Sequence, residues 1–368
     1  AAEAERRLDE GFAGVPFGLP NEPVPQGGSR TGGGSPFTVF LYGLTRWRDL
    51  FTPRQLCALA RFVRHTRSAT DVMLAGGYPQ EWSEAIVAYL AVMLDRLANQ
   101  GSALSRWNQG GQKIEGTFAR FALPILWDYA EVNPLGQTSG GYPSAFDWVT
   151  LAAAHLIAAA GGMPTPHSVR ASAVTTLHTG VDVIVTDPPY YDAIPYCDLM
   201  DFFHVWLRRT LHSVSPEFDT AFGEPTGPKW DTDRSDGELI DDASRFGGDK
   251  GRSKSAYEDG MSRAFFACHE SLQSDGRLVV VFAHKQPNAW EALVAAIIRS
   301  GFVVDASWPI QTEMGTRTRA LSSAALSSSV WLVCKKRPEA ARSGWDSRVL
   351  DEMHERIATR LRGFWDAG

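Results

Sequence analysis

The chain has 368 residues, enough for one large domain or two smaller ones, and its hydrophobic (44%) and aromatic (11%) fractions support a real core. Its four cysteines, Cys57, Cys197, Cys268 and Cys334, are widely spaced, which argues against disulfides and a zinc site and favours a reducing cytosol. The longest apolar run, 151–163, is too short to span a bilayer, and no signal peptide is visible. We therefore expect a cytoplasmic protein with no membrane and no metal.

The first part of the chain reads as an arm followed by helices. Residues 1–36 are rich in Gly and Pro, which predicts a linker or an extended arm. Residues 37–164 have the apolar spacing of a mainly helical region. The helices expected there span 53–66, 80–99, 114–130 and 147–160.

Strands and helices then alternate over residues 165–338, which predicts an α/β catalytic region with a Rossmann-like sheet. The last two strands look antiparallel. Residues 339–368 end the chain with an amphipathic helix at 346–362. The strands expected in the α/β region span 169–171, 181–186, 277–282, 302–308 and 329–334, and its helices span 198–209, 255–272 and 290–300.

The strand at 181–186 is a near-continuous Val/Ile run, which fits a strand buried on both faces. It ends in Asp187-Pro188-Pro189-Tyr190. Ligands bind beyond the carboxyl ends of strands in open α/β sheets, where these residues are expected. The tetrapeptide resembles motif IV of the amino-methyltransferases, which methylate an exocyclic amine of adenine or cytosine with S-adenosylmethionine.

The chemistry explains this combination of residues. The lone pair of an exocyclic amine is delocalised into the ring, and Asp187 and the Pro188 carbonyl can each accept one amine hydrogen. The prolines at 188 and 189 fix φ, and Tyr190 offers a ring on which a flipped base can stack. These four residues are the candidate catalytic residues. The competing interpretation is a strand followed by a Pro-Pro turn with one packed tyrosine.

Further aromatic residues follow the tetrapeptide. Tyr191 and Tyr196 could line a base pocket or only close it. In the next helix Leu199, Phe202, Phe203 and Trp206 form an apolar stripe, which we interpret as core packing.

The run from Thr186 to Arg209 resembles the large bacterial and archaeal adenine-specific DNA methylases of the DUF1156 group. The resemblance extends to residues 50–56, 127–134, 282–285, 312–314 and 327–334. It implies an S-adenosylmethionine-dependent methyltransferase fold, DNA as substrate, N6 of adenine as the methylated atom, and a role in restriction-modification or antiviral defence. An aspartate in the first motif position favours adenine, because cytosine enzymes more often carry serine there.

The cofactor side departs from this pattern. Such enzymes hold S-adenosylmethionine with a Gly-rich loop after the first strand, and 12–18 and 75–78 match it only loosely. We therefore expect the C-terminal portion of a larger enzyme, or half of a split one, whose N-terminal segment or partner subunit carries the loop. Thr52 resembles the motif X threonine that reaches the methionine carboxylate, although a plain N-cap explains it as well. Ser172 stands where relatives carry an acid that contacts the cofactor's adenine, and Asp187 is a third cofactor candidate.

The net charge of −6 means that DNA binding depends on local basic patches. Arg317 and Arg319, on a loop rich in Ser, Thr and Gly, are the preferred substrate contacts over Arg208/Arg209 and the basic residues at 250–254. Residues 213–255 are polar and lack periodicity, so they predict a mobile loop that orders on nucleic acid, or an insertion without function.

Other activities stay open at this point. The alternatives are a non-catalytic nucleic-acid-binding subunit of a defence complex, an N4-cytosine methyltransferase, and an enzyme that methylates RNA or protein.

Overall fold

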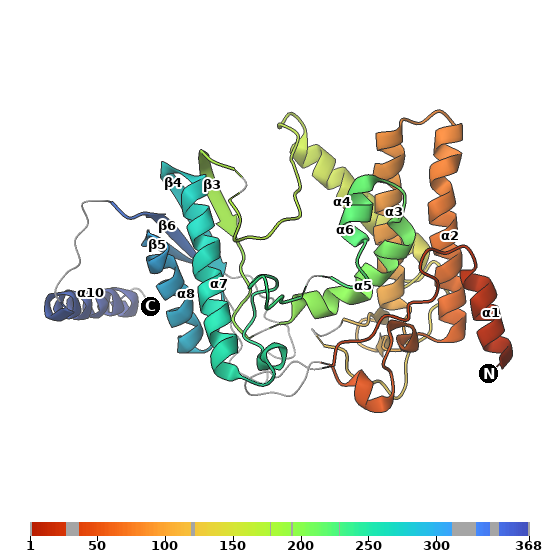
Figure 1. The fold of residues 1–368 in the computed structure, drawn as a ribbon, viewed down its shortest axis with the longest axis horizontal. Coiled ribbons are helices and arrows are strands. Elements are labelled where there is room, and N and C mark those ends of the chain that lie inside the picture. The colour runs from red at the N-terminus through yellow and green to blue at the C-terminus, as the bar shows by residue number, and fades with distance from the viewer. Residues whose placement is uncertain are drawn as a thin grey trace. The chain divides into compact units, whose positions relative to one another are not determined.

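The computed structural model of the chain is a mixed α/β fold that forms two compact units (Figure 1). The first unit comprises Ala1–Thr175, Pro188–Ala264 and His284–Leu293, and the second comprises Thr176–Asp187, Phe265–Ala283 and Val294–Gly368. The residues that the structure describes are 2–26, 37–118, 122–176, 178–192, 194–227, 229–310, 329–338 and 346–366.

Helices dominate the first unit, and those predicted at 53–66, 80–99 and 147–160 are confirmed. Thr52 caps the longest of them: its hydroxyl accepts the Gln55 N–H (3.3 Å), while the Gln55 side chain accepts the Thr52 N–H (2.7 Å). The α-helices of this unit are α1 (Ala2–Phe12), α2 (Pro53–Ala75), α3 (Gln80–Gln100), α4 (Tyr142–Ala160), α5 (Tyr196–Leu211) and α6 (Pro216–Phe222), and its 3-10 turns are Val39–Tyr42, Trp47–Leu50 and Ala243–Phe246.

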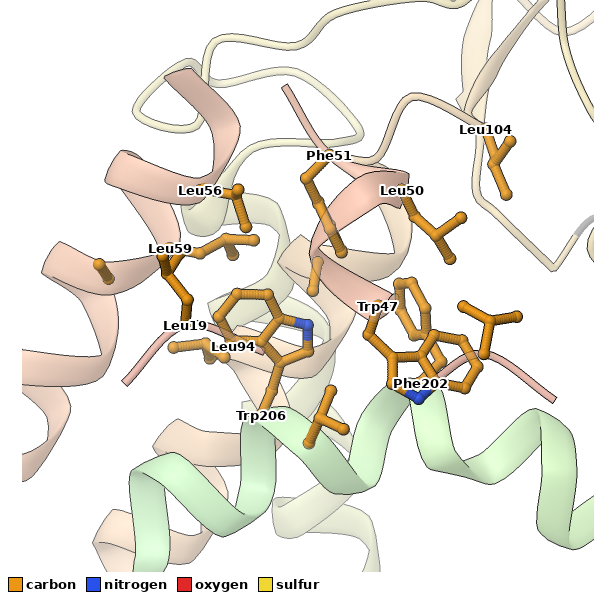
Figure 2. Packing of buried hydrophobic residues seen from close by; sticks show 14 of the residues in the cluster. Leu19, Trp47, Leu50, Phe51, Leu56, Leu59, Leu94, Leu104, Phe202 and Trp206 are labelled. Carbon is orange, nitrogen blue, oxygen red and sulfur yellow. The ribbon is translucent and has the colours of Figure 1, made fainter. Parts of the chain in front are cut away.

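The core of the first unit forms around α5, as Figure 2 shows. Phe202 and Trp206 are fully buried (0% exposed). The ring of Phe51 stacks on Phe202 with centroids 5.7 Å apart and meets Trp206 edge-on at 5.5 Å. Leu199 also belongs to this cluster, so the apolar stripe predicted for α5 is core packing.

The prediction of an arm at the N-terminus is wrong for residues 2–26. Helix α1 occupies Ala2–Phe12, and Leu8 and Phe12, one helical turn apart, are buried in the core. Glu22 binds the guanidinium groups of Arg209 (3.0 Å) and Arg208 (3.3 Å). The Arg209 side chain is 1% exposed, so it is a structural tie and not a surface contact for nucleic acid.

The helix predicted at 114–130 is also wrong. Strand β2 (Lys113–Glu115) pairs antiparallel with β1 (Arg106–Asn108), and residues 116–118 and 122–130 form no helix. The backbone passes so close to the end of α3 that a Cβ on Gly116 would lie 2.8 Å from Nδ2 of Asn99. This close approach and Pro124 explain why the apolar residues here do not continue as a helix.

The second unit contains a mixed four-stranded sheet in the order β3-β4-β6-β5. Strand β3 pairs parallel with β4, whereas β6 pairs antiparallel with both β4 and β5. The predicted antiparallel closing pair is thus confirmed, while the short strand predicted at 169–171 does not form. The strands are β3 (Val181–Thr186), β4 (Leu272–Phe282), β5 (Phe302–Ile310) and β6 (Ser329–Lys336).

Helices α7 (Lys250–Ser271) and α8 (Pro287–Arg299) each begin in the first unit and end in the second, and α10 (Asp346–Asp366) lies near the end of the chain (Figure 1). The helices predicted at 255–272, 290–300 and 346–362 are confirmed. Phe265, Ile297 and alternate β4 residues such as Leu278 and Val280 are buried. These buried apolar residues belong to the core of the second unit.

Strand β3 differs from the prediction in its burial. It is the outer strand on its side of the described sheet, and Val183 and Val185 are 53% and 61% exposed. The two valines share a face because side chains alternate along a strand. Among the described residues of the second unit, none gives this face of β3 the cover expected for a strand buried on both sides.

The segment 213–255, predicted as a mobile loop, contains α6, a 3-10 turn and the start of α7. Ion pairs tie it to α5, because the Lys229 ammonium lies 2.8 Å from Asp201 and Arg245 lies 3.3 Å from Asp198. Within the segment, Arg245 also lies 2.6 Å from Glu238. Ordering on nucleic acid stays a prediction, but the segment has its own regular structure and tertiary bonds.

Candidate active site

Asp187 follows β3 directly, at the carboxyl end of a strand that runs parallel to β4. Thr186 pairs with Val280, so both strands end at the same edge of the sheet. By strand alternation Asp187 continues the exposed face of Val183 and Val185. The residue is exposed, and no described residue forms a hydrogen bond or an ion pair with its carboxylate. A carboxylate in this state is able to accept hydrogen bonds from a ligand.

The chain turns tightly after Asp187. Within this turn the Pro189 carbonyl accepts hydrogen bonds, whereas the Pro188 carbonyl accepts none from the described residues. The Pro189 carbonyl accepts the Tyr191 N–H (3.0 Å) and the Tyr257 hydroxyl (2.9 Å). These two bonds occupy both of its lone pairs. Among the described residues none donates to the Pro188 carbonyl, so this oxygen, next to Asp187, is the acceptor that the turn keeps available.

Tyr191 lies inside this turn and not on its surface. It is 7% exposed, and its ring meets Tyr257 edge-on at 5.1 Å and His284 at 6.0 Å. Burial, together with the negative charge of Asp241, raises the pKa of the Tyr191 hydroxyl above its ordinary value. A role for Tyr191 in lining or closing a base pocket stays a prediction.

The backbone of Tyr191 is strained. Its φ of 58° lies in the left-handed region, which costs a bulky L-residue about 1–2 kcal/mol. The Asp241 N–H donates to the Tyr191 carbonyl at 3.1 Å and helps to hold this conformation. Such strain persists only where neighbouring bonds fix the backbone, and it is typical of functional turns.

His284 and Asp192 form a largely buried pair beside this turn. The His284 Nε2 lies 3.1 Å from Asp192 Oδ1, and both side chains are at most 10% exposed. The Gln286 N–H donates to Nδ1 at 3.1 Å, which places the remaining ring proton on Nε2. The imidazole is thus oriented as a donor to Asp192.

The other predicted substrate residues have different settings. Tyr190 is half-buried and Tyr196, the first residue of α5, is 50% exposed. Both rings could contact a ligand. Arg317 and Arg319 lie outside the described residues, as do residues 312–314 of the resemblance.

The predicted cofactor residues Thr52 and Ser172 both have protein partners. The Thr52 hydroxyl caps α2, which fits the plain N-cap interpretation. The Ser172 hydroxyl donates to Asp236 at 2.8 Å, within the first unit. A cofactor contact from either residue stays a prediction.

A cavity of about 360 Å³ opens at the N-terminal turn of α2. Two segments on which the resemblance depends meet here, since Arg54 of the first pairs with Glu131 of the second. Gln55 is 7% exposed, lines the cavity, and its Nε2 has no partner among the described residues. This unsatisfied donor is suited to an acceptor group on a ligand. The lining residues are Arg54, Gln55, Ala58, Leu59, Leu97, Gly101, Glu131, Val132, Asn133, Pro134 and Gly140.

Sequence reasoning missed the residues that support the turn. Asp192 and His284 lie just after two apolar strands, and this position is a signal that could have linked them. Tyr257 and Asp241 gave no such signal, because they come from a helix and a loop far along the chain.

No helix in the described part of the chain is both long and apolar enough to cross a bilayer. No family model matches the chain, and no curated protein or solved structure matches it either.

Proposed function

We propose that this chain is the catalytic chain of an S-adenosylmethionine-dependent DNA methyltransferase with a Rossmann-like sheet, acting on an exocyclic amine and most specifically on N6 of adenine. The observation that carries the proposal is the state of Asp187. An exposed carboxylate without a described partner ends a parallel strand, and the next carbonyl, of Pro188, also lacks a described donor.

These two oxygens suit an exocyclic amine, which presents two hydrogens. Each oxygen accepts one hydrogen, and the nitrogen lone pair is thereby turned out of conjugation with the ring. The half-buried ring of Tyr190 offers a stacking surface to a base that has left its duplex. When bound, the cofactor would supply the methyl group and leave as the thioether, and the methylated amine would give up one proton to solvent. No covalent bond to the protein would be needed.

Substitution of Asp187 tests the proposal in the assembled enzyme. Asp187→Ala should lower the rate of methyl transfer from labelled S-adenosylmethionine to DNA by about 10²–10³-fold, the range for loss of one oriented acceptor. Asp182→Ala, at the exposed start of the same strand, is the matched control and should leave the rate unchanged. Equal rates for Asp187→Ala and the unsubstituted enzyme would rule the proposal out.

The residues present fit only part of the cofactor. Within the first unit, the unpartnered Gln55 amide at the α2 cavity is a donor that an acceptor group of the cofactor could use. In the described chain, however, β3, β4 and β6 are followed by Asp187, Ala283 and Arg337, none of which begins a Gly-rich loop.

We therefore place the cofactor loop on another polypeptide segment or subunit. The bare face of β3 supports this part of the proposal, because strands of open α/β sheets are covered on both faces. Exposed backbone at the outer edge of a strand is also able to pair with a further strand.

Calorimetry with S-adenosylmethionine tests this division of labour. The chain alone should bind weakly or not at all, since a few polar contacts do not offset the freedom that a ligand of this size loses. Stoichiometric binding at micromolar concentration would show that the chain contains its own complete cofactor site.

A further inference from the structure

The turn that follows Asp187 is held by side chains to which the proposed reaction gives no role. Tyr191 adopts a φ of 58° although it is a bulky residue. Its main chain is fixed on both sides, through the bond from its N–H to the Pro189 carbonyl (3.0 Å) and the bond from Asp241 N–H to its own carbonyl (3.1 Å). Local bonds of this kind keep a backbone in a conformation that it would otherwise leave.

The aromatic ring of Tyr191 is fixed as well. Tyr257 of α7 meets it edge-on with ring centroids 5.1 Å apart, and His284 meets it edge-on at 6.0 Å. Asp241, whose N–H donates to the Tyr191 carbonyl, is itself held because its carboxylate accepts the Ser253 hydroxyl at 2.5 Å. A rotation of the Tyr191 backbone would therefore break contacts to three separate segments of the chain.

The pair of His284 and Asp192 closes the far end of the turn. The Gln286 N–H fixes Nδ1 as an acceptor, so Nε2 donates to Asp192. The indole of Trp290 donates to the His284 carbonyl at 2.9 Å and holds the main chain of this histidine. His284 is thus held at its main-chain carbonyl and at both ring nitrogens. Through its Nε2–H it fixes the position of the Asp192 carboxylate.

We propose that His284 and Asp192, together with Tyr257, form a clamp that positions the Pro188 carbonyl and the Tyr190 ring for the reaction. The inference rests on the proposed function for its consequence in catalysis. Tyr257 occupies the Pro189 carbonyl and so leaves Pro188 as the acceptor beside Asp187. His284 is a positioning residue: it acts through Asp192 and the turn and does not touch the base.

Kinetics of the assembled enzyme test the clamp. His284→Leu removes the donor and should lower kcat for methyl transfer at least tenfold, with the KM for S-adenosylmethionine within twofold. His284→Gln should recover most of the rate, since its amide can still donate to Asp192. If His284 acted only in folding, a difference in kcat between His284→Leu and His284→Gln would come with a difference in melting temperature. Different kcat values at equal melting temperatures therefore indicate a positioning role.

A double-mutant cycle separates the pair from its surroundings. If His284 acts through Asp192, the variant that combines His284→Leu with Asp192→Leu should be no slower than the slower single variant. Additive losses would overturn the clamp. Asp192→Asn retains an acceptor oxygen and is the milder variant, expected within threefold of the normal kcat.

A second readout does not depend on activity. In the full chain labelled with 15N-histidine, the Nε2–H of His284 should give a proton signal that exchanges slowly with water, and Asp192→Leu should abolish its protection. A proton found on Nδ1, or equal exchange in both proteins, overturns the clamp even in an active enzyme. The two proposals can also fail separately. If the Nε2–H signal is protected as expected but the unsubstituted assembly does not methylate DNA, the proposed function is wrong, whereas the clamp still holds this turn.

Discussion

Strand β3 precedes the Pro188–Asp192 turn along the chain and helix α5 follows it. Both are strongly apolar, but β3 has one exposed face (the bare region), whereas α5 is buried in the core of the first unit (the enclosed region). In β3, Val183 and Val185 are more than half exposed, whereas Phe202 and Trp206 of α5 are fully buried. Helix α5 has its cover within the first unit, from aromatic and leucine side chains of the N-terminal half. An apolar pattern therefore predicts that a helix or strand packs against other apolar side chains. It does not predict which part of the protein, or which partner, supplies those side chains.

The largest expected effect is in the enclosed region. Trp206→Ala should lower the free energy of unfolding by about 3–5 kcal/mol, because it opens a large cavity in the core. Urea denaturation followed by far-UV circular dichroism measures the loss. Trp82→Ala on α3, where the side chain is 64% exposed, is the matched control and should change stability by less than about 0.5 kcal/mol. Equal effects at the two sites would contradict the described core.

The helical first unit also contains a buried carboxyl group, Asp95, whose ionisation lowers the stability of the fold. Burial raises the pKa of the Asp95 carboxyl on α3 well above its usual range, and its Oδ1 has no partner among the described residues. A raised pKa means that the folded state holds this proton more tightly, so stability falls as pH rises from the unfolded value of about 3.9 through the folded value.

Asp95→Asn removes this dependence. At pH 8 the variant should be more stable than the unsubstituted chain by about 1 kcal/mol or more, since one pKa unit corresponds to about 1.4 kcal/mol. The advantage should shrink as pH falls and vanish near pH 4, where the carboxyl is protonated in both states. Melting curves across this range decide it, and a constant difference at every pH would exclude the assigned cause.

The smallest effect is expected in the bare region. Val183→Ser in the free chain should change stability by less than about 0.5 kcal/mol, because the side chain is already hydrated. Val280→Ser, at a fully buried position of the neighbouring strand β4, should cost at least about 1–3 kcal/mol for the buried hydroxyl and the lost methyl contacts. Urea melts compare the two. If Val183→Ser proves as costly as Val280→Ser, the face of β3 is covered in the free chain.

The sequence predicted the elements that repeat a simple period. The helices around 53–66, 80–99 and 255–272 and the strand at 181–186 all show local apolar spacing, and each forms. Predictions failed where long-range packing overrides composition. Residues 2–26 look like a linker because Gly and Pro are frequent, but their sparse apolar side chains reach the α5 core.

The candidate site divides in the same way. Asp187 and its neighbours form one uninterrupted motif, so they could be found from the sequence. Tyr257 and Asp241 reach the Pro188–Asp192 turn from 49 or more positions away in the chain, and only the fold brings them there. Local motifs mark the groups that meet a substrate, whereas the groups that hold them are set by tertiary structure.

The bonds of Arg209 have a practical consequence for shortened versions of this protein. Its guanidinium donates to the Gly18 carbonyl (2.7 Å), the Leu19 carbonyl (2.8 Å) and Glu22, all within the Gly- and Pro-containing stretch that composition predicts as a linker. A chain that starts after residue 26 would retain the cation in its interior without these acceptors, and breaking a buried pair in this way costs about 3–5 kcal/mol. Expression of the helical half should therefore keep residues 2–26, or replace Arg209 together with them.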